Sequence, residues 1–413
     1  MQFFYFQLIG TALLLGIQWY VYSGIRGYLG RKPRFRLLLL ILSLSFFLFN
    51  LPMAAAPLLR VAGFRAPLWV TIDLMPLIYL WHFVWTVLFL MLVMGKFLKI
   101  PFFTLEWVMK RFDRTRPAVE SFRNHPKFQK FDMRRRQLVR RGLTVVTGAI
   151  AFGAVSEFYG KETFDKTDID IPIKNLPESF DGYSIGFLSD IHSGSFMSEE
   201  RMRRYAESLN GLGAEMIVIT GDFVNSSLDE VYPFRDAFRI LSATDGVYGV
   251  LGNHDYYTRR VGDVAREIEN AGIQLLRNDS VTIGRRGDEI KLVGVEDTGS
   301  YDTAMGYFNA TTDHGRRGLA RILLCHRPYF FKGAAQTGYG LVLSGHTHGG
   351  QVVLGELGKD VLAPARIASP YVAGLYTHRD SRMYVSRGIG TVGVPFRFNC
   401  PPEITRIVLR REV

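Results

Sequence analysis

Cysteine and charged residues are both scarce in this chain of 413 residues. The two cysteines, Cys325 and Cys400, exclude a disulfide framework and a metal site built on paired Cys-x-x-Cys motifs. Charged residues make up 21 % of the chain, which is low for a soluble protein, whereas hydrophobic residues make up 48 %. This composition excludes extensive disorder, and it also excludes a chain made only of one ordinary soluble domain.

The positive charge is confined to the N-terminal third of the chain. Residues 1–141 hold 21 basic and 5 acidic residues, whereas the remainder holds 29 basic and 33 acidic residues. A nucleic-acid-binding domain is expected to carry a basic patch on its folded surface. The slightly acidic C-terminal part lacks such an excess, so we expect no nucleic-acid partner.

Three long uncharged stretches lie near the N-terminus, at residues 3–22, 37–59 and 74–95. Each is long enough to cross the hydrocarbon core of a bilayer as a helix, which is about 30 Å thick. They predict a transmembrane region with three helices over residues 1–95. His82, inside the third stretch, is expected to pack between helices, with a proton or ligand role as the alternative.

The basic residues between these stretches predict how the chain crosses the membrane. Cations in the 26–36 loop and in the basic, aromatic linker 96–141 are expected to stay on the cytoplasmic side. That linker is expected to lie on an anionic leaflet or to be solvated. The uncharged stretch 142–156 predicts a fourth span or signal-like anchor over 142–158, which would place residues 159–413 outside the cytoplasm. If it lay flat in the interface, that part would remain cytoplasmic.

From about residue 161 the pattern changes to short apolar runs separated by Gly, Asp and Asn, alternating with amphipathic stretches. This alternation is typical of an α/β fold. The first expected strands are 183–190, 214–222 and 246–255. The expected helices are 198–210, 230–242 and 259–271. Later strands are expected at 290–295, 319–325, 340–345, 382–386 and 404–410, with fewer helices between them.

Polar side chains gather where five of these strands end. They are Asp190 and His192, Asp222 and Asn225, Asn253, His254 and Asp255, His326, and His346 and His348. Ligands of open α/β sheets bind outside the carboxyl ends of the strands. Buried Asp, Asn and His side chains are costly to desolvate unless they share a cation. Any one of these motifs alone could be a polar turn, but together they predict a metal site.

The order D-x-H, G-D-x-x-N, G-N-H-D, C-H, G-H-T-H resembles that of the calcineurin-like metallophosphoesterase superfamily over about residues 180–410. The resemblance implies an α/β, metallophosphoesterase-type β-sandwich flanked by helices and preceded here by the transmembrane region. It also implies two divalent metal ions, of manganese, iron or zinc. The ligands of the first would be Asp190, His192, Asp222 and His348. The ligands of the second would be Asp222, Asn253, His326 and His346, so that Asp222 bridges the two ions.

In the same resemblance His254 stands beside the metals without being a ligand, where it would protonate the leaving oxygen or stabilise the transition state. The family commonly has an Asp where this chain has Asn225, and that Asp orients the histidine. The departure implies either a weaker acid role here or replacement by Asp255 or another acid. We therefore predict His254 and Asn225 as catalytic residues.

GHTHGGQVVL and the segment 384–404 look like a bacterial branch that includes membrane-tethered phosphoesterases and enzymes similar to UDP-2,3-diacylglucosamine hydrolases. Arg387 and Arg397 lie among glycines in this segment. Their guanidinium groups are predicted to bind a substrate phosphate, with a purely structural role as the alternative. Cys325, on an apolar strand, is expected to be a small core residue.

Together these features predict a membrane-anchored, metal-dependent phosphohydrolase, multi-pass in a bacterial inner membrane. The anchor favours a phosphorylated substrate that is lipid-linked or held at the membrane surface, with a scissile phosphoester or pyrophosphate bond. One alternative is a periplasmic phosphodiesterase with a soluble substrate. Another is a membrane sensor whose output domain is a phosphoesterase.

Overall fold

The computed structural model describes residues 2–31, 33–61, 75–97, 100–112, 116, 117, 121, 125, 163–311, 319–357, 360–393 and 397–412. The chain divides into two compact units, Met1–Gly160 and Lys161–Val413, and each is described by itself. The predicted anchor 142–158 and most of the linker 96–141 lie outside the described residues.

The first unit is helical in the residues that the structure describes. Its helices are α1 (Gln2–Leu29), α2 (Arg36–Val61), α3 (Met75–Phe97) and α4 (Ile100–Lys110). Two stretches, Leu8–Leu29 and Pro33–Ala55, are long and apolar enough to cross a membrane, and Trp81–Phe97 is a shorter apolar stretch. These segments support membrane association, and the number of spans stays a prediction.

Aromatic and polar contacts join the first three helices. The rings of Tyr22 in α1 and Phe46 in α2 stack with centroids 4.4 Å apart, and Trp85 of α3 packs edge-on against Phe46 at 5.5 Å. The side chains of Gln18 and His82 are buried and lie within hydrogen-bond distance of each other, joining α1 to α3. His82 therefore packs between helices, as the simpler of its two interpretations predicted.

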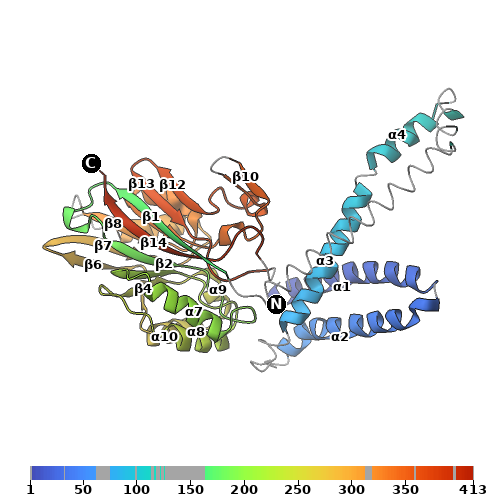
Figure 1. The fold of residues 1–413 in the computed structure, drawn as a ribbon, viewed down its shortest axis with the longest axis horizontal. Coiled ribbons are helices and arrows are strands. Elements are labelled where there is room, and N and C mark those ends of the chain that lie inside the picture. The colour runs from blue at the N-terminus through green and yellow to red at the C-terminus, as the bar shows by residue number, and fades with distance from the viewer. Residues whose placement is uncertain are drawn as a thin grey trace. The chain divides into compact units, whose positions relative to one another are not determined.

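Two six-stranded mixed sheets make up the centre of the second unit (Figure 1). The first sheet has the order β1-β14-β2-β3-β4-β5 and the second has the order β12-β13-β9-β8-β7-β6. The strands of the first are β1 (Asp165–Ile173), β14 (Glu403–Arg411), β2 (Ser184–Leu188), β3 (Met216–Thr220), β4 (Val247–Val250) and β5 (Gln274–Leu275). The strands of the second are β12 (Gly374–His378), β13 (Ser381–Val385), β9 (Leu341–Ser344), β8 (Ala320–Leu324), β7 (Asp288–Gly294) and β6 (Asp279–Arg285).

Helices cover the outer faces of both sheets. Figure 1 shows α7 (Glu199–Asn210), α8 (Val231–Phe238) and α10 (Val261–Asn270) together beside the first sheet. Two helices, α11 (Tyr301–Ala310) and α12 (Phe331–Gln336), pack against the second sheet. Their side chains Phe308 and Phe331 share a buried cluster with residues of β8 and β9. The shorter elements are α9 (Asn253–Tyr257) and the hairpin of β10 (Gly355–Leu357) and β11 (Asp360–Leu362).

The main core lies between the two sheets. Phe187 and Val218 of the first sheet share one buried cluster with Leu292, Ile322 and Leu343 of the second. Burial of such side chains contributes about 1.5–3 kcal/mol each. The predicted α/β sandwich flanked by helices is therefore confirmed, and its stability depends on the fit between the two sheets.

Candidate metal centre

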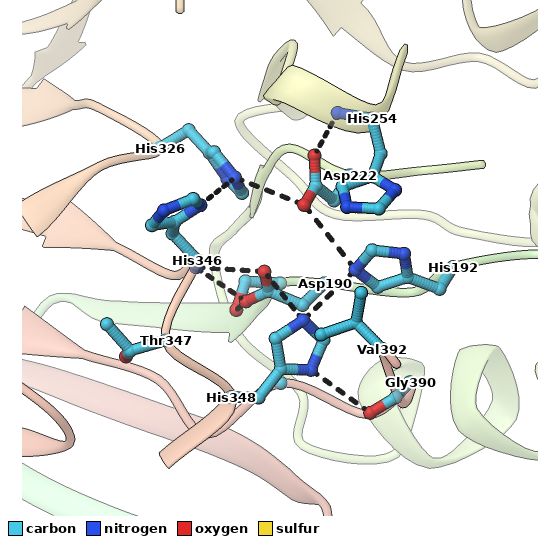
Figure 2. A network of polar contacts seen from close by, with 12 residues as sticks. Asp190, His192, Asp222, His254, His326, His346, Thr347, His348, Gly390 and Val392 are labelled. Atoms are coloured by element: carbon cyan, nitrogen blue, oxygen red, sulfur yellow. Dashed lines mark hydrogen bonds and ion pairs between the residues drawn. The ribbon is translucent and has the colours of Figure 1, made fainter. Parts of the chain in front are cut away.

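The carboxyl ends of parallel strands from both sheets meet at one edge of the sandwich. In the first sheet β2, β3 and β4 run parallel, and in the second sheet β8 and β9 do. The loops that follow these five strands carry the predicted ligands, and Figure 2 shows most of them converging. Neighbouring parallel strands end at the same edge, so residues far apart in the sequence come together here.

The first group of possible ligands consists of Asp190, His192, Asp222 and His348, all buried. One ligand atom from each lies within 4.8 Å of the others. The Nε2 atoms of His192 and His348 are 3.1 Å apart, and His192 Nε2 lies 3.4 Å from Asp222 Oδ2. This is the set predicted for the first metal ion.

The second group consists of Asp222, His326 and His346, within the same 4.8 Å limit. His326 Nε2 lies 3.2 Å from Asp222 Oδ2 and 3.2 Å from His346 Nδ1. Asp222 Oδ2 therefore faces a histidine of each group, and this carboxylate is the one residue that the two described groups share. The arrangement suits a carboxylate bridge between two cations.

Asn253, predicted as the remaining ligand, begins helix α9 beside the second group. Its side-chain Nδ2 donates a hydrogen bond to the Tyr257 hydroxyl at 3.1 Å. Its Oδ1 is buried and has no hydrogen-bond partner among the described residues. A buried carbonyl oxygen without a partner is costly, so this atom is available as a neutral metal ligand.

The histidine ring orientations also fit a metal centre. His326 Nδ1 donates to the Thr220 carbonyl at 2.7 Å, and His348 Nδ1 donates to the Gly390 carbonyl at 3.2 Å. A carbonyl only accepts, so these contacts fix a proton on Nδ1 and turn the Nε2 atom, the one left to bind a metal ion, toward the carboxylates. Imidazole and carboxylate donors together suit manganese, iron or zinc.

The neighbouring rings of His326 and His346 have opposite pKa shifts, because the buried carboxylates favour a positive charge beside them. Burial and the charge of His326 lower the pKa of His346 to about 3. Burial also disfavours the charged form of His326, but the carboxylate of Asp222 outweighs it and raises the pKa of that ring to about 10. A positive charge beside Asp222 is thus strongly favoured, as expected where carboxylates are buried together.

Five of the possible ligands have a left-handed backbone conformation. Positive φ values between 50° and 73° occur at Asp190, His192, Asp222, His346 and His348. Asp and His adopt this region more readily than most residues, at a cost of about 1–3 kcal/mol each. Their concentration at one place indicates that the surrounding sandwich holds the ligand loops in strained conformations.

Two glycines allow the loops to approach each other closely. A Cβ atom at Gly252 would collide with Asp222 Oδ1, and one at Gly345 would collide with Asp190 Oδ2. Gly252 immediately precedes Asn253, and Gly345 immediately precedes His346. The glycines in these two motifs are therefore required by packing against the ligand carboxylates.

His254 lies beside both groups and is oriented by Asn225 through its main chain. The ring Nδ1 of His254 donates to the Asn225 carbonyl at 2.6 Å, and the His254 backbone N–H donates to Asp222 Oδ1 at 2.8 Å. The ring also packs against Tyr257, with centroids 4.8 Å apart. The Asn225 carbonyl, rather than its side chain, thus makes the contact that an acid was expected to make.

Asp255 has a different role from the one considered for it. Its buried carboxylate accepts the backbone N–H groups of Asp222, Phe223, Val224 and Gly252 at 2.8–3.1 Å. Both oxygens are therefore used in holding the loop that carries Asp222. Glu230 acts similarly on the next turn, where its Oε2 accepts the N–H groups of Asn225, Ser226 and Ser227.

Sequence reasoning missed Glu230 and Tyr257, and it gave Asp255 only as a substitute acid. The signal for Asp255 was its place in the G-N-H-D motif. Glu230 shows a weaker signal, since it stands three residues after Ser227, the spacing of a capping box that the structure contains. Tyr257 follows Asn253 by one helical turn, but α9 is too short for a periodic pattern to reveal it.

Arg387 and Arg397 contact the protein itself. The buried Arg397 guanidinium donates to the carbonyls of His348, Arg387, Gly388, Gly390 and Cys400. Arg387 forms ion pairs with Glu403 at 2.6 Å and Asp165 at 2.9 Å. These contacts match the structural alternative, and the predicted binding of a substrate phosphate remains a prediction. Cys325 is a buried core residue, as expected.

Residues 183–350 match the family described as calcineurin-like phosphoesterase, and these residues contain both groups of possible ligands. The chain therefore contains a calcineurin-like metallophosphoesterase domain, which confirms the predicted family. The match to the branch of UDP-2,3-diacylglucosamine hydrolases stays a prediction.

Three relatives illustrate the similarity. A protein of Danio rerio named "Transmembrane protein with metallophosphoesterase domain" is 32 % identical over 59 % of this chain and 57 % of its own length. An uncharacterized metallophosphoesterase of Helicobacter pylori is 31 % identical over 54 % of this chain and 58 % of its own length. YkuE, an uncharacterized metallophosphoesterase of Bacillus subtilis, is 28 % identical over 66 % of this chain and 97 % of its own length. The chain thus spans somewhat more than half the length of the first two.

Proposed function

We propose that this protein is a phosphoesterase that works with two divalent metal ions bridged by Asp222. One observation carries the proposal: two groups of possible ligands, all buried except the half-buried His346, share this single carboxylate at the edge of the sandwich. Two further observations support it. Asn253 Oδ1 is buried without a hydrogen-bond partner among the described residues, and the Nε2 atoms of His192 and His348 face each other. The family of the domain gives the expected reaction, which is hydrolysis of a phosphoester or pyrophosphate bond.

The first ion would be held by the group of Asp190, His192, Asp222 and His348, and the second by Asp222, Asn253, His326 and His346. When bound, such ions activate a phosphoryl group and a water molecule as Lewis acids. The protein residues hold these ligands in position before any substrate arrives. Asp255 does so for the Asp222 loop, and the carbonyls of Thr220 and Gly390 do so for two histidines.

His254 is proposed to protonate the leaving oxygen. Its Nδ1 proton is committed to the Asn225 carbonyl, so Nε2 is the nitrogen that exchanges a proton with the substrate. The ring is half-buried, whereas the metal ligands around it are nearly all buried. It is therefore the imidazole of this cluster that is suited to meet an incoming ester without being a ligand.

The proposed substrate is a phosphorylated compound that is lipid-linked or held at the membrane surface. The long apolar helices of the first unit support membrane anchoring, as does the transmembrane relative from Danio rerio. Anchoring raises the effective concentration of the active site at the bilayer. A soluble phosphodiester substrate and a sensor with a phosphoesterase output remain the alternatives, and they predict different substrate profiles.

Substrate assays with metal analysis test this proposal directly. The purified full chain is loaded with manganese, iron or zinc and assayed for phosphate release from phospholipids, sugar nucleotides and soluble diesters. We expect two metal ions per chain and faster release from the lipid-linked compounds. Turnover that survives complete removal of metal would refute the enzyme class, whereas a preference for soluble diesters would refute only the lipid substrate.

The topology proposal places the second unit outside the cytoplasm of a bacterium. It rests on the cations of the 26–36 loop and the linker, and it is tested by cysteine labelling of intact cells. Lys166→Cys offers an exposed position in β1, and Arg34→Cys offers one in the loop predicted to be inside. Cys325 and Cys400 are buried and should not react. Protection of residue 166 until lysis would contradict the exported orientation.

A further inference from the structure

A basic recess lies at the C-terminal end of α1. It has a volume of about 490 Å³, and its lining includes Trp19, Tyr22, Ser23, Arg26 and Arg31. Both arginine side chains are exposed at this position. The recess therefore offers two guanidinium groups, which are donors suited to a phosphate group.

An apolar recess lies next along α1, between that helix and α2. It has a volume of about 680 Å³, and its lining includes Leu15, Gly16, Trp19, Phe47 and Leu51. Trp19 lines both recesses and is 50 % exposed. The two recesses are thus neighbours, one apolar and one basic, with an indole ring between them. Trp side chains favour this boundary position in membrane proteins.

The charge of the basic recess is not balanced by its own helices. Residues 1–72 contain no Asp or Glu, so neither α1 nor α2 has an acidic residue to pair with Arg26 or Arg31. A zwitterionic headgroup would bring a cation that finds no carboxylate on these helices. An anionic headgroup would bring only the charge that the recess lacks.

We propose that the two recesses form one binding site for an anionic glycerophospholipid. Its phosphate lies between Arg26 and Arg31, and an acyl chain lies along the apolar recess beside Gly16 and Leu51. The site goes beyond the phosphoesterase proposal and does not depend on the metal centre. The site would give the first unit a preference for anionic lipid. This preference would not depend on which substrate the second unit hydrolyses.

Binding of defined lipids to the full chain tests the site. The protein, purified and delipidated in a neutral detergent, is titrated with phosphatidylglycerol and with phosphatidylcholine of the same acyl chains, and bound lipid is counted by native mass spectrometry. We expect phosphatidylglycerol to bind at least about tenfold more tightly. Glycerol phosphate is added as a competitor, and we expect it to compete weakly because it cannot occupy the apolar recess.

One matched pair of double variants separates binding in the basic recess from general electrostatic attraction. The double variant Arg26→Gln, Arg31→Gln should lose most of the preference for phosphatidylglycerol. The double variant Arg34→Gln, Arg36→Gln removes the same charge from exposed residues outside the recess lining and should keep it. Equal losses in both double variants, or no preference in the original chain, would overturn the proposal.

The apolar recess is tested without changing any charge. A Cβ atom at Gly16 or at Gly24 meets no atom within 4 Å, so either position accepts a larger side chain. Gly16→Phe should fill the recess and weaken phosphatidylglycerol binding, whereas Gly24→Phe, on the same helix but outside both linings, should not. Unchanged binding by Gly16→Phe, or strong competition by glycerol phosphate, would show that the apolar recess takes no part. Unchanged metal content and phosphate release would show that the metal centre is unaffected.

Discussion

The buried carboxylate of Asp255 accepts the backbone N–H of Asp222 at 3.1 Å, so one acid positions another without touching its side chain. The same Asp255 oxygen accepts the Gly252 N–H, and the other oxygen accepts those of Phe223 and Val224. Four donors from two loops therefore converge on one carboxylate. Its role is to hold the loops that carry the shared ligand and Asn253.

Asp255→Asn is expected to loosen this arrangement. An amide offers one acceptor oxygen, and its NH₂ group would face two buried N–H donors, at a cost of about 1–3 kcal/mol for each donor left without a partner. We expect a lower melting temperature and metal affinity reduced by about 10–100-fold. Asp263→Asn is the control, because Asp263 pairs with Arg260 and Arg266 at the surface. Equal melting temperatures for the two variants would contradict this role.

Asp222→Asn is expected to remove metal from both groups while the fold is kept. The substitution takes away the charge that His192 and His326 both face. We expect less than one metal ion per chain by elemental analysis and no measurable phosphate release, with an unchanged circular dichroism spectrum. Asp170→Asn, at an exposed carboxylate of β1, should change neither quantity. Full metal content with normal turnover would refute the bridging role.

His254→Ala is expected to slow poor leaving groups more than good ones. If Nε2 donates a proton to the leaving oxygen, alkyl phosphoesters should lose about 10²–10⁴-fold in rate, and a nitrophenyl ester should lose much less. His378→Ala is the control, since His378 lies at the end of β12 and its ring packs near Phe331 of α12. The same loss for both esters, accompanied by loss of metal, would instead identify His254 as a ligand.

Tyr257→Phe is expected to weaken the second metal site selectively. The Tyr257 hydroxyl accepts from Asn253 Nδ2, which leaves Oδ1 free as the ligand atom. Without the hydroxyl the amide can rotate, and we expect metal affinity of one of the two sites to fall by about tenfold or more. Tyr232→Phe, at a surface position of α8, is the matched control. Two sites of unchanged affinity would mean that another contact orients Asn253.

The sequence predicted the buried strands well because they are continuous apolar runs. β2, β3, β8 and β9 are buried at nearly every position, and the possible ligands follow their ends in the order expected. It did not predict β1, β6 and β12, where exposed and half-buried residues predominate. Such edge strands have polar sequences that resemble loops, and their pairing depends on distant partners, as for β1 with β14.

The ligand types were predictable from the motifs, but the contacts that orient them were not. The carbonyls of Thr220, Asn225 and Gly390 orient three histidines, and any residue type could supply them. The same holds for Arg397, whose buried guanidinium donates to five main-chain carbonyls. Main-chain contacts leave no signature in side-chain identity, so they became visible only in three dimensions.

The ligands are divided between the two sheets of the sandwich. Asp190, His192, Asp222 and Asn253 follow strands of the first sheet, and His326, His346 and His348 follow strands of the second. If two ions bind as proposed, they would link the two sheets and would oppose sliding of one sheet over the other. By the same logic, a substitution that disturbs the packing around Phe187 or Leu343 between the sheets should lower the metal affinity, although neither side chain belongs to the groups of possible ligands.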